Sequence, residues 1–152
     1  MYRELILNLS KENSWVKIQP PCSAEEIRRA EQVVGYPFPK ELCELLQEVN
    51  GDHFCLLSTE QIIANVERNR EIWLPLFEED YSKEKYIELV DRFIFFATNG
   101  CGDYYCYRVN EKGVPDETAI YIWEHESLGE KCWKKVAGNM EEFITRYYKG
   151  EI

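Results

Sequence analysis

The sequence predicts an α+β fold in which helices pack around a mainly antiparallel central sheet. Helical patterns of apolar residues occupy much of the first half of the chain and return at its end. Strand-like aromatic runs lie mostly between them and are joined by short turns. Because short turns connect antiparallel neighbours, this order favours an α+β layering over an alternating, doubly wound sheet.

A β-hairpin over residues 92–109 is the centre of the predicted sheet. An apolar run from Phe93 ends at the turn dipeptide Asn99-Gly100, and a second aromatic strand begins at Tyr104. Gly100 and Gly102 imply backbone angles that a side chain would resist. We expect the carboxylate of Asp103 to accept local backbone N–H groups and so to hold the loop.

Two helices are predicted before residue 36. Residues 2–13 place apolar side chains on one helical face and charged side chains on the other. Ser23 and Glu26 have the spacing of a capping box, which opens a second helix. Gly35 is expected to close that helix.

The third helix has the clearest pattern in the chain. Pro39 suits its first position, where a missing N–H does no harm. Apolar residues then follow at i, i+3, i+4 and i+7 from Leu42 to Val49. Asn50 and Gly51 are expected to form its left-handed C-terminal cap.

Residues 52–91 change character several times. A short strand is expected over 53–57, and Ser58 with Gln61 forms another capping box that opens a helix over 59–70. The apolar run 72–77 is broken by a proline and leads into three consecutive acidic residues. A further helix is expected over about 82–90.

The chain beyond the hairpin adds two strands and one helix. A turn is predicted over 110–113, followed by strands over 118–123 and 132–136. Asn139 and Glu142 form the last capping signature, which opens a C-terminal helix.

Composition predicts one globular domain over residues 1–152. The chain is 45% apolar and 14% aromatic, which argues against disorder. Its net charge of −10 argues against direct binding of nucleic acid, because neutralising phosphates requires clustered Lys and Arg. A basic protein partner fits this charge better, although surplus acid that only maintains solubility is the simpler explanation.

Neither a secretory signal nor an uninterrupted apolar run of membrane-spanning length is visible, so we expect a soluble cytoplasmic protein with no membrane contact. The six cysteines are scattered, and free thiols are expected. Neither a metal nor a cofactor is predicted. A metal site assembled from Cys55, Cys101 and His125 is an open but less favoured alternative to buried thiols.

Catalytic templates fit poorly, so we expect that the protein is not an enzyme. Cys101 as a nucleophile would need His53 or His125 as its base, and both are distant in sequence. Glu124, His125 and Glu126 could perform acid–base chemistry, but neighbours in a strand point to opposite faces. A solvated strand end is the favoured interpretation of these three residues.

The order and spacing of several short motifs resemble the SUKH superfamily over about residues 23–148. This superfamily includes the fungal cell-wall-synthesis regulator of the Smi and Knr type. The matching segments are Ile27-x3-Glu31, Gly35-Tyr36-Pro37-Phe38-Pro39-x2-Leu42-x2-Leu45-Leu46-x3-Asn50-Gly51, Phe95-Phe96-Ala97, Gly100-x-Gly102-Asp103-x-Tyr105, Tyr121-x-Trp123-x-His125-Glu126 and Phe143.

The resemblance implies an α+β fold without a catalytic centre and a role in immunity, in which a small cytoplasmic protein neutralises a polymorphic toxin, often a nuclease. A scaffold or regulatory module, as in the fungal relatives, is the alternative. The matching positions would shape the fold rather than bind the toxin; they are Gly35, Pro39, Asn50, Gly51, Gly100, Gly102, Asp103 and Trp123. Cys101 within the turn departs from the pattern and could be oxidised.

An inhibitor of a basic nuclease domain gains affinity and on-rate from an acidic surface with aromatic anchors. We therefore expect partner binding, by stoichiometric occlusion, at two acidic clusters and two tryptophans. These residues are Trp73, Glu78, Glu79, Asp80, Glu124, Glu126, Glu130 and Trp133. So aromatic a chain is also compatible with a homodimer.

Overall fold

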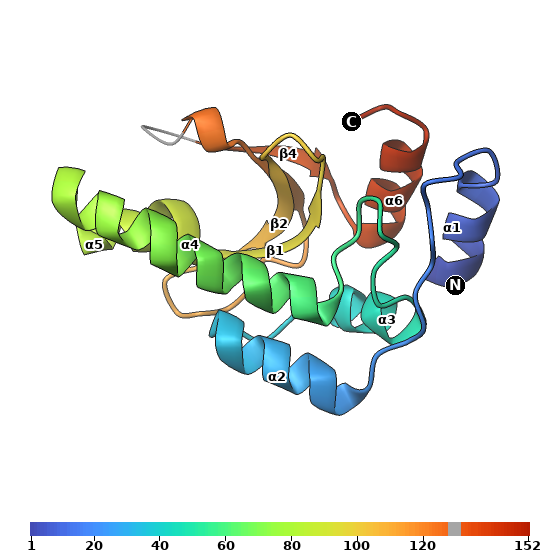
Figure 1. Ribbon diagram of the computed structural model, residues 1–152, viewed down its shortest axis with the longest axis horizontal. Coiled ribbons are helices and arrows are strands. Elements are labelled where there is room, and N and C mark those ends of the chain that lie inside the picture. The colour runs from blue at the N-terminus through green and yellow to red at the C-terminus, as the bar shows by residue number, and fades with distance from the viewer. Residues whose placement is uncertain (128–131) are drawn as a thin grey trace.

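The computed structural model describes residues 1–127 and 132–152, and its first half is helical (Figure 1). A long helix, α4, crosses the molecule, and both termini lie at the end of the molecule opposite the C-terminal end of this helix. The helical elements before the sheet are α1 (Tyr2–Leu9), α2 (Ala24–Val34), α3 (Lys40–Glu48), α4 (Thr59–Asp80), α5 (Lys83–Tyr86) and the π-helical turn η1 (Ile87–Asp91).

The sheet has four strands in the order β1-β2-β3-β4, and every neighbouring pair is antiparallel. The predicted α+β class, antiparallel sheet and central hairpin are therefore confirmed. A 3-10 turn, η2 (His125–Ser127), follows the third strand, and α6 (Met140–Tyr148) ends the fold. The strands are β1 (Phe93–Thr98), β2 (Tyr104–Arg108), β3 (Ile120–Trp123) and β4 (Trp133–Ala137).

Both faces of the sheet are buried at β1. Ile94 and Phe96 belong to a large core cluster with α1, α2, α3, α6 and the first half of α4. Phe93 and Phe95 belong to a second cluster, which includes residues from the end of α4, from α5 and from η1. Since successive residues of a strand point to opposite faces, a strand covered on both sides has a continuous apolar sequence. This explains the unbroken run in β1.

Three predicted helix starts are confirmed by side-chain caps. The hydroxyl of Ser23 accepts the N–H of Glu26 at 3.1 Å, and the amide of Asn139 accepts that of Glu142 at 2.8 Å. Ser58 and Gln61 form a reciprocal capping box at the start of α4. Each cap satisfies an N–H that the helix itself leaves without an acceptor.

The boundaries of α1 and α3 differ from those predicted. Helix α1 ends at Leu9 rather than at residue 13, and Pro39 is the N-cap of α3 rather than its first residue. Helix α3 ends at Glu48, and the next residue, Val49, has an extended backbone. The prediction that Asn50 and Gly51 cap α3 in a left-handed conformation is therefore wrong.

Asn50 and Gly51 instead join α3 to α4. The Asn50 side chain accepts the N–H of Thr59 at 2.8 Å, in the first turn of α4. Gly51 has a φ of +88°, and a Cβ at this position would lie 2.9 Å from the backbone nitrogen of Ser58. Only glycine allows the two backbones to approach this closely.

The prediction of a strand over 53–57 is wrong, because this segment makes only an isolated bridge between Leu56 and Ala97 of β1. The carboxylate of the buried Asp52 accepts the N–H groups of Phe54, Cys55 and Leu56 at 3.0, 2.8 and 2.8 Å. This local arrangement replaces a β-ladder, since those donors are already used.

Helix α4 continues ten residues beyond its predicted end and passes through Pro75. Proline has no N–H, so the carbonyl of Glu71 lacks its usual helical donor. The burial of Phe77 and the packing of Trp73 in the second cluster offset this cost. The helix predicted over 82–90 is present as α5 followed by η1. Within the described residues, no helix has both the length and the apolar character that crossing a membrane requires.

Candidate functional site

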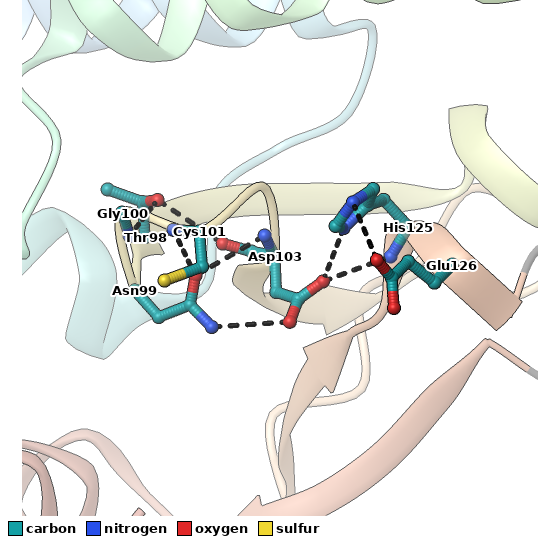
Figure 2. A network of polar contacts seen from close by, with 7 residues as sticks. All are labelled: Thr98, Asn99, Gly100, Cys101, Asp103, His125 and Glu126. Carbon is teal, nitrogen blue, oxygen red and sulfur yellow. Dashed lines mark hydrogen bonds and ion pairs between the residues drawn. The ribbon is translucent and has the colours of Figure 1, made fainter.

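The tip of the β1–β2 hairpin is organised by Asn99 (Figure 2). Its side-chain oxygen accepts the N–H of Cys101 at 2.8 Å and that of Asp103 at 3.3 Å. Gly100 and Gly102 take left-handed φ angles of +79° and +96°, as their positions in the sequence predicted. The local backbone N–H groups that we expected Asp103 to accept are thus accepted by Asn99.

Asp103 instead joins the hairpin tip to the turn after β3. Its Oδ1 accepts the backbone N–H of His125 at 3.1 Å and lies 2.7 Å from Nδ1 of the same residue, while Oδ2 accepts an N–H from Asn99 at 3.2 Å. The His125 ring lies against Gly102, where a Cβ would approach Cε1 to 2.8 Å. Figure 2 shows the network that results.

The electrostatics of this contact favour an ionised Asp103. Burial opposes ionisation of the carboxyl, but the hydrogen bonds from the His125 side chain, the His125 backbone and Asn99 outweigh it and lower the pKa of Asp103. The carboxylate is therefore a stable acceptor that fixes two loops.

The tip does not assemble a cysteine nucleophile. The Cys101 side chain is exposed and, within the described residues, makes no hydrogen bond to His125. Nδ1 of His125 is taken by Asp103, and its Nε2 lies 3.9 Å from Glu126. Glu124 forms a separate ion pair with Lys134 at 3.1 Å, so the acid–base cluster considered from the sequence is divided.

The alternative metal set is also not brought together. Cys55 is buried and Cys101 is exposed. Across residues 1–127 and 132–152, no three His, Cys, Asp or Glu side chains are grouped as metal binding would require. The cysteines in the structure are free thiols, as the sequence predicted, and four of them are buried.

Part of the acidic charge supports the architecture, which the sequence analysis missed. Tyr107 donates to Glu41 at 2.6 Å and Tyr36 donates to Asp91 at 2.8 Å. Tyr148 donates to the buried Asp52, 96 positions away. Burial and the neighbouring carboxylate raise the pKa of each of these three tyrosines. No sequence spacing could have indicated pairs so far apart.

The first predicted acidic cluster lies on the end of α4. Glu78, Glu79 and Asp80 are all exposed. None of them makes a side-chain hydrogen bond or ion pair with residues 1–127 or 132–152. Trp73, on the same helix, is half-buried against the second core cluster. The three carboxylates are therefore free to act on a partner, and their role in binding stays a prediction.

The second cluster follows β3. The Glu126 side chain is 88% exposed, whereas Glu124 is partly buried and paired with Lys134. Glu130 lies outside the described residues. The guanidinium of Arg108 stacks over the Trp133 ring, with its carbon 4.2 Å from the centroid. Trp133 is thus already in contact with a cation of its own chain.

Trp123 connects the third strand to the element that precedes the sheet. It is buried in the second cluster and donates its indole N–H to the carbonyl of Leu89 at 2.8 Å. This bond connects β3 to the π-helical turn η1 that precedes the sheet.

Three apolar residues beside the first acidic cluster were not identified from the sequence. Ile72, Leu76 and Tyr81 are 50, 46 and 66% exposed. The apolar run 72–77 was visible in the sequence, but its proline obscured the helix and therefore the side to which each residue points. These side chains give the end of α4 an apolar as well as an acidic surface.

Comparison with curated proteins gives no match. Comparison with protein families gives one match, which spans residues 21–146. This range begins just before α2 and includes most of α6. The matched region contains the α3–α4 connection, the hairpin tip and the His125 turn, which are the motifs that carried the resemblance. The chain therefore belongs to the SMI1 / KNR4 family (SUKH-1).

Proposed function

We propose that this protein is an immunity protein that binds a cognate polymorphic toxin in the cytoplasm and neutralises it by stoichiometric occlusion. Membership of the SUKH-1 family supports an immunity or regulatory role based on protein–protein interaction. The finer proposal is that the partner is the basic nuclease domain of a toxin.

The free carboxylates at the end of α4 are the observation that carries this proposal. Glu78, Glu79 and Asp80 are exposed and have no cationic partner among the described residues. A nuclease must present positive charge to its substrate, so an acidic surface competes for that charge and accelerates encounter. Elsewhere, carboxylates such as Asp103 and Asp52 are occupied by donors of the fold.

We propose further that inhibition requires no catalysis by this chain. The titratable groups at the hairpin tip support this. Asp103 and His125 contact each other, and the exposed Cys101 thiol is not part of their contact. Such an arrangement fits a structural contact better than an activated nucleophile.

Co-expression tests the proposal directly. The toxin candidate is the variable C-terminal domain of a long secreted protein encoded by a neighbouring reading frame. Cells that carry both proteins should survive, and the two should co-purify at a one-to-one ratio. Cells left unprotected would contradict immunity and favour the regulatory alternative within the family.

Charge reversal tests the electrostatic part. A charge-reversal variant should bind the toxin more weakly, and its binding should depend less on salt. In this variant lysine replaces Glu78, Glu79, Asp80, Glu124 and Glu126. A variant with five reversed charges elsewhere controls for the change in net charge. Its lysines replace the exposed residues Glu4, Glu12, Glu25, Glu111 and Glu141. Unchanged binding and unchanged salt dependence in the first variant would show that these charges do not contribute.

A further inference from the structure

The second half of α4 has an apolar side that the rest of the described chain leaves exposed. Asn65, Asn69, Ile72 and Leu76 follow one another at spacings of four, three and four residues, which places them along one side of the helix. Asn65 and Asn69 are buried, whereas Ile72 and Leu76 are 50 and 46% exposed. In Figure 1, α4 extends beyond the end of α2.

Pro75 lies beside this apolar side and changes its hydrogen-bonding capacity. The residue is exposed, and its missing N–H leaves the carbonyl of Glu71 without the donor that a regular helix would supply. The carbonyl is therefore able to accept a hydrogen bond from outside the helix. An incoming N–H or cation would satisfy it.

Charge surrounds the same apolar side. Glu71 lies one turn before Pro75, and Glu79 and Asp80 lie one turn after Leu76. These three carboxylates have no ion pair within the described residues. Glu79 and Asp80 also lie at the C-terminal end of α4, where the helix dipole is negative and where the last turn holds no basic residue. Acids at this end oppose helix formation, and cations from a partner would relieve the repulsion.

We infer that this distal α4 face, consisting of Ile72, Pro75 and Leu76 with Glu71, Glu79 and Asp80 at its edge, docks a cationic amphipathic helix of the partner protein. The inference rests on the proposed function and specifies the chemistry of the toxin surface. Apolar side chains of the partner helix cover Ile72 and Leu76, and its Lys or Arg side chains meet the acidic edge. A second copy of this chain would place like charges together at the edge and is disfavoured.

The probe for docking is a synthetic amphipathic helix made of leucine and lysine, titrated into the full chain and followed by methyl NMR. The methyl signals of Ile72 and Leu76 should shift, while those of the exposed Leu7 and Val114 should not. Leu76→Ser should weaken binding about tenfold or more, and the matched control Val114→Ser should not. Shifts spread over the surface, or equal weakening by both substitutions, would overturn the inference.

The co-expression assay separates the docking surface from the immunity role. A folded Ile72→Lys/Leu76→Lys variant should fail to protect cells that the unmodified chain protects. Protection by both would refute this docking face and leave immunity intact. Failure of the unmodified chain to protect, together with peptide binding at Ile72 and Leu76, would refute immunity and leave the docking face intact.

Discussion

Oδ1 of Asp103 lies 2.7 Å from Nδ1 of His125. This contact joins the tip of the β1–β2 hairpin to the turn that follows β3. The β2–β3 ladder ends nearby, at the pair Tyr104–Trp123. The carboxylate also accepts the His125 backbone N–H, so one side chain continues the connection beyond the last strand pair. The Gly100–Asp103 motif and the His125 motif therefore meet in one contact between the hairpin tip and the following turn.

Replacement of Asp103 by asparagine should lower the free energy of unfolding by about 1–3 kcal/mol, because charge-assisted bonds to His125 are lost. The pKa of Asp103 is lowered in the folded protein, so its stabilising effect is present above the unfolded pKa of about 3.9 and is lost as pH falls through the folded value. Urea unfolding at neutral and acidic pH measures both effects. The difference between the two proteins should shrink in acid. Glu126→Gln, at an 88% exposed position, should change little.

Gly102→Ala should destabilise the protein more than Gly100→Ala. Both residues have left-handed φ angles, so each substitution incurs a backbone cost of about 1–2 kcal/mol. Only at Gly102 does the new Cβ also meet the His125 ring, at 2.8 Å, because open space surrounds Gly100. Thermal unfolding of both variants provides the comparison.

Adding His125→Ala to each glycine variant isolates the steric effect. The extra cost at Gly102 should then largely disappear, whereas the cost at Gly100 should not change. Equal destabilisation by both glycine substitutions would show that the His125 ring moves away freely.

The sequence was sufficient where a local signal determined a local structure. The Ser58–Gln61 capping box predicts the start of α4, and the turn at Asn99-Gly100 predicts the hairpin. It was insufficient at Pro75, where the local preference to end a helix is outweighed by the burial of Phe77 in the second core cluster, against Tyr86 of α5. A proline penalty is visible in the sequence, but the burial that offsets it is not.

The sequence indicated the negative charge of the candidate site but only part of its geometry. The acidic run at Glu78 was apparent from the sequence, but the exposure of Leu76 depends on how the rest of the chain packs against α4. The Asp103–His125 contact spans 22 positions, and only the β2–β3 pairing brings the two residues together. Motifs indicated both residues, but the contact itself required the fold.

Asp52→Ala should be among the most destabilising substitutions in the chain. The buried carboxylate accepts three backbone N–H groups between residues 54 and 56 and the hydroxyl of Tyr148. Removal leaves several buried donors without an acceptor, at about 1–3 kcal/mol each, so a loss above about 3 kcal/mol is expected. Chemical denaturation measures it.

Two further variants divide this loss between the backbone and the tyrosine. Tyr148→Phe removes one donor and keeps the three backbone bonds, so it should cost about 1 kcal/mol. Asp52→Asn retains one acceptor oxygen and should lie between the other two. A Tyr148→Phe loss as large as that of Asp52→Ala would place the main contribution in the tyrosine contact.

Neutralising the end of α4 should make the protein more stable and a weaker binder. Glu78→Gln, Glu79→Gln and Asp80→Asn together remove negative charge from a helix C-terminus, which should raise the free energy of unfolding by about 1 kcal/mol. The same variant should bind the proposed toxin partner less tightly and with a shallower salt dependence, because the partner's cations lose their acceptors. Urea unfolding and calorimetric titration measure the two quantities.

The matched control is Glu60→Gln, in the first turn of the same helix, where acid is favourable. It should lower stability slightly and leave binding unchanged. A purely structural role for the three acids would make the triple variant less stable, and a purely solubilising role would leave its affinity unchanged. Only a surface retained for binding, against the preference of the helix itself, raises stability and lowers affinity in one protein.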